Sequence, residues 1–483
     1  MRSLKIAALL AMSFFASVAA RAEMLAAAGK VDITPNIKTE KTYLAGYGFM
    51  GRNPVGVHDP LYARIIVISN KKETLAIVGL DLIGFFRNQV KDLRKLSGFN
   101  QPGKYLFVAS THDHSGPDTL GLWGPWPGVS GVNSQYLQRI ESAVAKKINQ
   151  LSQNLKPVRL SGVTRELPPN GLCRDSRDPV VIDPYFSVVH VESLDRKTVA
   201  NIVHWPCHAE VLNHSNQFLT ADFPGVLCDR MEKKSGGTCV FINGPIGGLL
   251  TPEETKGKDG SWEENNRIGK AIADFALQNL PRATPINASK ISVSSQTVLI
   301  PVQNSRYLLF LYSLVFGHKL FLKDGAPLKE SPYWIALKHA FHLLKPKESP
   351  WVKSEVSLIR VGPLTILGIP GEIFPELVIG GYHGRYRFGH PLIKPSNPNP
   401  PDLSKAPKGP YLWSEIPGKI KIVAGLANDE LGYMVPGYDF KVTRDLIMEP
   451  RPKGDHYEET NSVGPAVTDI VVNAAKSLLS SSK

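Results

Sequence analysis

The sequence predicts an α/β fold in which helices flank mixed β-sheets, with the active site of a single large catalytic domain at strand ends and loops. Short apolar runs alternate with segments of helical spacing. Several of these runs stop abruptly at a histidine or a carboxylate. The 483 residues are 42% hydrophobic and 20% charged, an ordinary globular balance. No internal repeat and no boundary between independent domains stands out.

The first 22 residues have the pattern of a secretory signal peptide. Arg2 and Lys5 precede an apolar run over residues 6–18, and the small-x-small sequence Ala20-Arg-Ala22 offers a cleavage site. This run is shorter than the roughly 20 residues that a membrane span needs. We therefore expect a mature chain over residues 23–483 that is exported and is either periplasmic or secreted.

The formal net charge of +13 would fall to +10 without this leader, which carries three basic residues and no acid. Such a balance favours anionic surfaces, including phospholipid head groups. Peripheral membrane contact is therefore one expectation, and a merely solubilising surface charge is the alternative. No Lys-rich or Arg-rich tract and no nucleic-acid-binding module is present, so no nucleic-acid partner is expected. Nothing in the sequence indicates an oligomeric state.

Four cysteines, at positions 173, 207, 228 and 239, fall within 67 residues. An oxidising compartment would allow one or two disulfides there, and the spacing lacks the CxxC pair of a structural zinc site. A bridge between Cys173 and Cys207 would brace the chain beside His208. The sequence leaves the pairing open.

Strands are expected where β-branched and aromatic residues run together. In the first half of the chain these runs cover residues 61–69, 74–80, 105–110, 187–191 and 199–205, and a further strand leads from residue 238 into a glycine-rich turn. Such a turn can present backbone N–H groups to an anion or oxyanion. Helices are expected over residues 136–155, where one face carries an apolar stripe, and from residue 226 to residue 231.

The second half continues the alternation. Strands are expected over residues 356–369 and 420–426, with a short helix over 375–379 and an amphipathic helix ending near residue 478. Residues 389–410 carry seven prolines and form a long surface loop. The apolar segment 306–322 is about seventeen residues long and is broken by Gly317, so we expect a buried or lipid-facing helix at the mouth of the site.

Two histidines end the strand over residues 105–110, in the sequence Thr111-His-Asp-His-Ser-Gly-Pro117. Residues two apart on an extended chain point to the same side, so His112 and His114 can face one cavity. The alternative is a polar surface turn. The aromatic loop over residues 120–128 is suited to the rim of a cleft.

His208, Glu372 and Tyr433 also follow strand-like segments, and 96, 164 and 61 residues separate His112, His208, Glu372 and Tyr433 in turn. Spacing alone cannot bring them together. Two neutral imidazoles and a carboxylate are common ligands of a catalytic zinc ion, whereas a phenol is unusual. Taken one at a time, these residues are better explained as a buried histidine, a helix N-cap partner and a core tyrosine.

From about Lys30 to Asn473 the chain resembles the catalytic domain of the neutral/alkaline non-lysosomal ceramidases. The segment Thr111–Pro117 resembles that family's Thr-His-Thr-His-Ser-Gly-Pro element, and Pro370-Gly-Glu372 resembles its Pro-Gly-Glu. Residues 425–433 and the later Tyr457-Glu458 resemble its Leu-Ser-Asn, Tyr and Tyr-Glu pattern. The ordered set is more specific than any one element.

The resemblance implies one zinc ion per chain, held by His112, His208, Glu372 and Tyr433, and hydrolysis of the ceramide amide to a sphingoid base and a fatty acid. His114 would carry a proton or stabilise the tetrahedral oxyanion, and Tyr457 would donate to the same oxygen. The family's Asn-Arg-Ser-Pro arginine corresponds to Arg174, with Arg177 as the alternative.

Two departures from the family limit this inference. Its Gly-Asp-x-Ser-Pro motif is replaced by Gly247-Gly-Leu-Leu-Thr251-Pro252, in which Thr251 keeps a hydroxyl and the aspartate is absent. The chain also ends shortly after Tyr457, so the family's C-terminal β-sandwich is not expected. The leading hypothesis is a zinc-dependent amidohydrolase acting on an N-acyl lipid. The alternatives are a zinc hydrolase of another amide or ester, and an inactive ceramidase-like binding protein.

Overall fold

The computed structural model describes residues 24–48, 50–255, 260–304, 317–341, 343–345, 348–382, 388, 390–441, 453–454 and 456–482. The expected leader and most of the apolar segment 306–322 lie outside these residues. Among the helices that are described, none is long and apolar enough to span a membrane.

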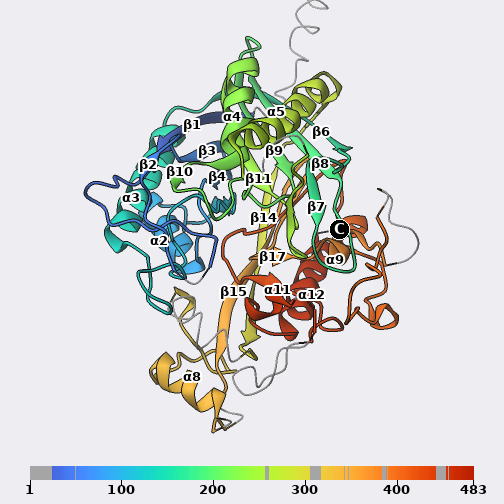
Figure 1. The fold of residues 1–483 in the computed structure, drawn as a ribbon. Helices are drawn as coiled ribbons and strands as arrows, with labels where there is room; N and C mark the ends of the chain where they lie inside the picture. The colour runs from blue at the N-terminus through green and yellow to red at the C-terminus, as the bar shows by residue number, and fades with distance from the viewer. Residues whose placement is uncertain are drawn as a thin grey trace, which may run out of the picture.

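A nine-stranded mixed sheet forms the first half of the fold (Figure 1). Its order is β11 (Thr238–Asn243), β9 (Thr198–Trp205), β8 (Tyr185–Ser193), β6 (Lys156–Glu166), β1 (Met24–Asp32), β3 (Tyr62–Ser69), β4 (Thr74–Leu80) and β5 (Lys104–Ser110), with β13 (Thr284–Pro285) paired to β6. Most pairs are antiparallel, but β4 with β5 and β9 with β11 are parallel.

A second, four-stranded sheet has the order β14 (Ile291–Pro301), β15 (Trp351–Val361), β16 (Leu364–Gly368) and β18 (Ile420–Ala424). Three two-stranded ribbons complete the β-structure: β2 (Gly56–Val57) with β10 (Phe218–Leu219), β7 (Cys173–Asp175) with β12 (Leu250–Pro252), and β17 (Glu372–Ile373) with β19 (Tyr433–Met434).

The two sheets pack face to face between layers of helices. Ile66 and Ile77 of the large sheet share a buried cluster with Ile359 of the second sheet. Their neighbours along the same strands face the opposite way, because side chains alternate across a strand. Ile65 and Val78 accordingly pack against helices α2 (Arg87–Ser97) and α3 (Ser134–Ser152). Helices α4 (Asp222–Ser235) and α5 (Trp262–Asn279) cover the same outer face farther along the sheet.

The outer face of the four-stranded sheet is covered by a second helical layer. Leu358 and Leu367 pack there with Val471 of α12 (Ala466–Ser481), and the short helices α9 (Pro375–Ile379) and α10 (Leu412–Glu415) join the same cluster. Helix α8 (Pro332–Ala340) projects from the body at the lower edge of Figure 1, and α11 (Tyr457–Thr460) lies close to α12. The expected α/β class is confirmed, and its arrangement is helix, sheet, sheet, helix.

Most of the predicted elements are present with small shifts of their ends. The helix expected from residue 136 begins at Ser134, because the Asn133 side chain accepts hydrogen bonds from the N–H groups of Gln135 and Tyr136. Three long strands, β1, β6 and β14, were not predicted, and neither were the strands of two or three residues. β1, β6 and β14 each carry alanine, serine or charged residues at their less buried positions, so none of the three has the dense apolar run that marks the predicted strands.

Candidate metal and acyl-transfer site

His112 and His114 follow the carboxyl end of β5, as expected. The His112 ring is 5% exposed, and its Nδ1 lies 2.7 Å from the carbonyl oxygen of Ile83. A carbonyl only accepts a hydrogen bond, so Nδ1 carries the proton and Nε2 keeps its lone pair. The backbone N–H of His114 donates to the Ala209 carbonyl, which links this loop to the chain after β9.

The His114 ring lies against the backbone of Gly46. A Cβ at Gly46 would stand 2.5 Å from His114 Cβ, and Gly46 has φ of +97°, so glycine is required there for both space and conformation. This close approach holds the imidazole in the cavity.

His208 is oriented in the same way as His112. It follows β9, is fully buried, and donates from Nδ1 to the carbonyl oxygen of Leu250 at 2.8 Å. Its Nε2 therefore also keeps a lone pair directed at the site. The parallel bridge between Asp113 and Ala209 places the two histidine-bearing segments side by side.

Glu372 and Tyr433 are brought together by the parallel pairing of β17 and β19, in which they are direct partners. Glu372 Oε2 lies 3.0 Å from His208 Nε2 and 3.7 Å from His112 Nε2. The Tyr433 hydroxyl lies 3.4 Å from His208 Nε2. The four residues named as zinc ligands thus meet in one place, although each comes from a different strand end.

The three imidazoles form one buried cluster. Ligand atoms of His112, His114 and His208 all lie within 4.8 Å of one another, so this group could hold a metal ion. The ring centroids of His112 and His114 are 4.9 Å apart, and those of His112 and His208 are 5.0 Å apart. His114 is therefore within reach of the same ion as its two neighbours.

Burial keeps these imidazoles neutral. It lowers the pKa of His112 to about 4, although the Glu372 carboxyl opposes this effect. It also lowers the pKa of His208, and burial together with the neighbouring imidazoles holds the pKa of His114 well below its usual value. Burial raises the pKa of Glu372 to about 7, against the opposing effects of His112 and of the Tyr433 hydroxyl.

These protonation states make the donor set fit a cation. The Nε2 lone pairs of His112 and His208 and the Glu372 carboxyl oxygen are all acceptors, and the Tyr433 hydroxyl beside them can donate to His208 or Glu372. The 3.0 Å contact between His208 Nε2 and Glu372 Oε2 requires either a proton on one of the two groups or a bound cation. Neutral imidazoles with Nδ1 fixed by carbonyls are the usual arrangement of histidine ligands.

An adjoining cavity of about 50 Å³ opens onto this cluster. Leu120, Leu122 and Trp123 form an apolar wall, so the aromatic loop does line the cleft as expected, and Trp126 of the same loop is 67% exposed. Tyr457 also lines the cavity, and its ring centroid lies 6.1 Å from that of Tyr433.

The structure places Thr251 and Arg174 beside the cluster rather than on the cavity wall. They are partners in the β7–β12 ribbon, where Arg174 is exposed and Thr251 is half-buried. The Thr251 hydroxyl donates to the carboxyl of Glu210. Glu210 Oε2 in turn lies 3.4 Å from His114 Nδ1, so Thr251 connects to the imidazoles only through Glu210.

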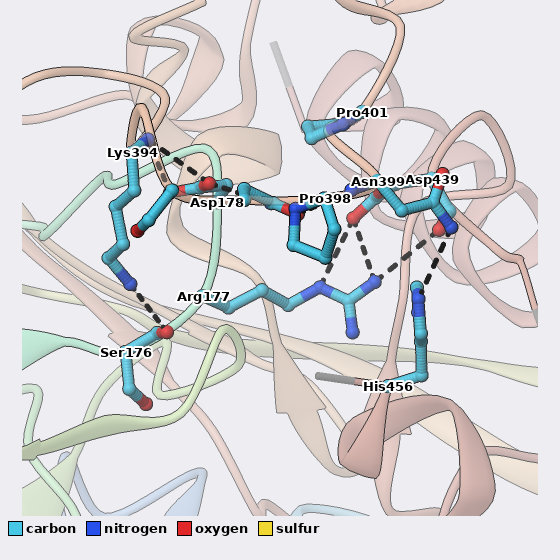
Figure 2. A pocket seen from close by; sticks show the side chains of 11 residues that line it. Ser176, Arg177, Asp178, Lys394, Pro398, Asn399, Pro401, Asp439 and His456 are labelled. Atoms are coloured by element: carbon cyan, nitrogen blue, oxygen red, sulfur yellow. Dashed lines mark hydrogen bonds and ion pairs between the residues drawn. The ribbon is translucent and has the colours of Figure 1, made fainter. Parts of the chain in front are cut away.

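Arg177 lines a separate pocket, shown in Figure 2. It is 6% exposed and pairs with three carboxylates, at 2.8 Å to Asp439, 2.8 Å to Glu458 and 2.9 Å to Glu459. Glu458 and Glu459 belong to α11, which also carries Tyr457. Arg177 therefore fixes the helix that presents Tyr457 to the cavity and does not itself face the imidazoles.

Two buried carboxylates of the site were not predicted. Glu210 stands two residues after His208, the same spacing as His112 and His114, and this spacing was the available signal. Glu430 lines the cavity and lies in the Asn428–Tyr433 stretch, where no local pattern distinguishes it from a turn residue.

The glycine-rich turn after β11 does not offer the backbone N–H groups of Gly244 and Gly247 to an anion. The Gly244 N–H donates to the Asn243 side chain, and the Gly247 N–H donates to the Ile373 carbonyl. These donors are thus already used within the protein. Through the hydrogen bond from Gly247 to Ile373, the turn instead holds the segment that carries Glu372.

All four cysteines are buried free thiols in the structure. Cys207 interacts with Cys173, and Cys239 interacts with Cys228. The two cysteines named for a possible bridge beside His208 are therefore neighbours, and the other two form a second pair.

Neither a family model nor a curated protein sequence matches this chain. Among solved structures, the chain is similar to the crystal structure of neutral ceramidase from Pseudomonas aeruginosa, with a TM-score of 0.63 and 17% identity over 95% of this chain and 75% of that one. It is also similar to a structure of a ceramidase complexed with C2, with a TM-score of 0.60 and 17% identity over 95% and 76% of the two chains. The chain therefore has the neutral ceramidase fold, as the sequence motifs predicted.

Proposed function

We propose that this protein is a metal-dependent hydrolase that cleaves the amide bond of an N-acyl lipid, with ceramide as the first substrate to test. One observation carries the proposal. The Nε2 atoms of His112 and His208 and the Glu372 carboxylate converge beside the Tyr433 hydroxyl, at a cavity with one apolar wall. The likeness of the fold to neutral ceramidases supports the choice of substrate.

His112, His208, Glu372 and Tyr433 would hold the metal, and zinc is the ion that neutral imidazoles and one carboxylate suit best. When bound, zinc supplies Lewis-acid chemistry that makes water a nucleophile near neutral pH. The protein contributes the fixed orientation of the ligands, through the carbonyl oxygens of Ile83 and Leu250.

His114 is the residue that we assign to proton transfer. Neither ring nitrogen makes a hydrogen bond of good geometry: Glu210 Oε2 lies 3.4 Å from Nδ1, the Gly46 backbone is close to the ring, and the ring faces the other two imidazoles. It would take a proton from the attacking water and deliver it to the leaving nitrogen as the C–N bond breaks. Tyr457, at the cavity edge, would donate to the carbonyl oxygen of the substrate.

The shape of the cavity supports a substrate with a long apolar part. About 50 Å³ holds the scissile group but not an acyl chain, so the chain would leave along Leu120, Leu122 and Trp123. Buried Leu120 and Trp123 belong to the same apolar cluster as Ile335 of α8. The outer side of α8 and the segment after it expose Tyr333, Trp334, Phe341 and Leu343, each more than 50% accessible. This surface would contact the lipid aggregate that contains the substrate.

A substrate panel with metal analysis tests the proposal. Purified protein is expected to contain about one zinc ion per chain and to hydrolyse ceramide in preference to a short-chain amide and a short-chain ester. Preference for the ester or the short amide would keep the metal and change the substrate. Stoichiometric zinc with no turnover of any acyl compound would support a binding protein instead.

A further inference from the structure

Glu430 is a buried carboxyl group of the cavity to which the proposed reaction assigns no role. It is 1% exposed and lies on the cavity wall with His112, Glu372 and Tyr457. Its Oε1 accepts a hydrogen bond from the Gly432 N–H at 2.9 Å, whereas Oε2 is buried and has no hydrogen-bond partner. One oxygen of this side chain is therefore satisfied by the protein and the other is not.

The backbone of Glu430 is held by hydrogen bonds on both sides of its Cα. The Glu430 carbonyl accepts from His318 Nε2 at 2.8 Å, and its N–H donates to the Asp429 side chain at 2.9 Å. Asp429 is itself fixed by the Ser354 hydroxyl at 2.6 Å. Gly84 leaves room for the side chain, since a Cβ there would stand 3.0 Å from Glu430 Cγ. The fixed backbone and the hydrogen bond to Oε1 therefore hold the Glu430 carboxyl group at the cavity wall.

An unsatisfied buried polar atom destabilises a folded protein, so a ligand that supplies its partner gains affinity. The cavity wall is divided into an apolar part, which includes Leu120 and Trp123, and a polar part that includes Glu430 and Asn461. The segments that carry Glu430 and Asn461 are joined by backbone hydrogen bonds: the Tyr433 N–H donates to the Asn461 carbonyl, and Gly432 and Ser462 form a β-bridge. The apolar part suits the acyl chain, which leaves the polar part for the amine portion of the substrate.

We propose that Glu430 selects acyl amides whose amine portion carries a hydroxyl group, through a hydrogen bond to Oε2. A hydroxyl group both donates and accepts, so it satisfies this oxygen whether or not the carboxyl carries a proton. Sites that hydrogen-bond a substrate hydroxyl reject analogues without it far more strongly than apolar pockets reject a missing methylene. The inference rests on the proposed function, since it defines the substrate class of the same site.

The test uses two compounds that differ in one group and are not hydrolysed. One is the hexadecanesulfonamide of 2-aminoethanol. The other is the hexadecanesulfonamide of propylamine, in which a methyl group replaces the hydroxyl of the first compound. Binding of each to the zinc-loaded full chain is measured by calorimetry. Wild-type protein is expected to bind the hydroxyl compound at least about tenfold more tightly. Equal binding of the two compounds by wild-type protein overturns the proposal without any variant.

Variants then assign the discrimination to Glu430. Glu430→Met keeps the length of the side chain and removes both oxygens, so the ratio of the two dissociation constants should fall to about one. Glu430→Gln keeps hydrogen-bonding capacity and should retain part of the ratio. Glu415→Met is the matched control, because Glu415 also has a buried carboxyl oxygen without a partner but does not line the cavity. A ratio in Glu430→Met equal to that of wild-type protein would assign the selection to another residue.

The corresponding amides separate this inference from the proposed function. The hexadecanoyl amides of 2-aminoethanol and of propylamine are offered as substrates. Discrimination in binding without hydrolysis of either amide would refute the amidase activity and leave the role of Glu430 intact. Hydrolysis of both amides with equal kcat/KM would support the amidase activity and refute the role of Glu430.

Discussion

His112 and His114 should fail in different ways when each is replaced by alanine. His112→Ala removes an imidazole whose Nε2 lies 3.7 Å from Glu372 Oε2 and whose orientation is fixed by the Ile83 carbonyl. Loss of residues that only orient a metal ligand costs roughly 10- to 100-fold in metal affinity, so loss of the ligand itself should cost more than about 100-fold. His112→Ala should therefore lose its zinc on dialysis.

His114→Ala should keep its zinc and lose turnover. Removal of a general acid or base lowers kcat by about 10²- to 10⁴-fold, which corresponds to about 3–5 kcal/mol of transition-state stabilisation. The His114 ring is held by Gly46 and contacts Glu210 rather than Glu372, so its loss leaves the His112, His208 and Glu372 set complete.

The assay combines zinc per chain by mass spectrometry, zinc affinity by chelator competition, and kcat on the substrate that the panel identifies. His190→Ala is the matched control, because His190 is a half-buried histidine of β8 that bonds Asn201 away from the site. Loss of zinc in both His112→Ala and His114→Ala would refute the division of roles. It would make His114 a third imidazole ligand, which the 4.8 Å grouping of the three rings permits.

Three further predictions concern the stability of the site, its pH dependence and its surface. Arg177→Met should lower the free energy of unfolding by about 3–5 kcal/mol, because it removes the buried positive charge that Asp439, Glu458 and Glu459 share; urea denaturation measures this, and a loss below about 1 kcal/mol would contradict it. Zinc affinity should fall about tenfold per pH unit below about pH 7, because the Glu372 carboxyl, whose pKa is raised to about 7, then takes up a proton that the metal must displace. Chelator competition at pH 8, 7 and 6 measures this affinity. A profile that does not change with pH would exclude Glu372 as a ligand. The double variant Trp126→Ser/Trp334→Ser should sediment less with phosphatidylglycerol-containing vesicles than wild-type protein. Leu194→Ser, which alters another exposed apolar residue in the β8–β9 hairpin, should not. Equal binding by wild-type protein, the double variant and Leu194→Ser would refute the lipid-facing surface.

The sequence by itself determined the elements that local pattern controls. Dense apolar runs marked β3, β4, β5, β9 and β11, and the places where they stop marked His112, His114 and His208. Strand alternation and helical periodicity are properties of neighbouring residues, so they can be read without the fold. Strands with serine, alanine or charged residues on one side, such as β6 and β14, lack that pattern and were not predicted.

The ordered motifs of a family pointed to four candidate metal ligands that spacing could not bring together, and the structure does place those four residues side by side. Their meeting depends on contacts between distant segments, above all the two-residue ribbon in which Glu372 and Tyr433 are partners. Contacts between distant segments also explain why the structure differs from the roles expected for Arg174 and Thr251. Whether Arg174 or Arg177 faces the imidazoles, and whether Thr251 reaches them, depends on how the β7–β12 ribbon lies against the sheets.

Only the tertiary structure decided which buried polar groups surround the histidines. Glu430 has no local signature, and Glu210 is marked only by its place two residues after His208. In the structure Glu210 approaches His114, and Glu430 lines the cavity with an unsatisfied oxygen. The burial of these groups, and with it the neutral state of the imidazoles and the raised pKa of Glu372, arises from packing between the layers of the fold. Sequence fixes which side chains are available, and long-range packing fixes their protonation and their partners.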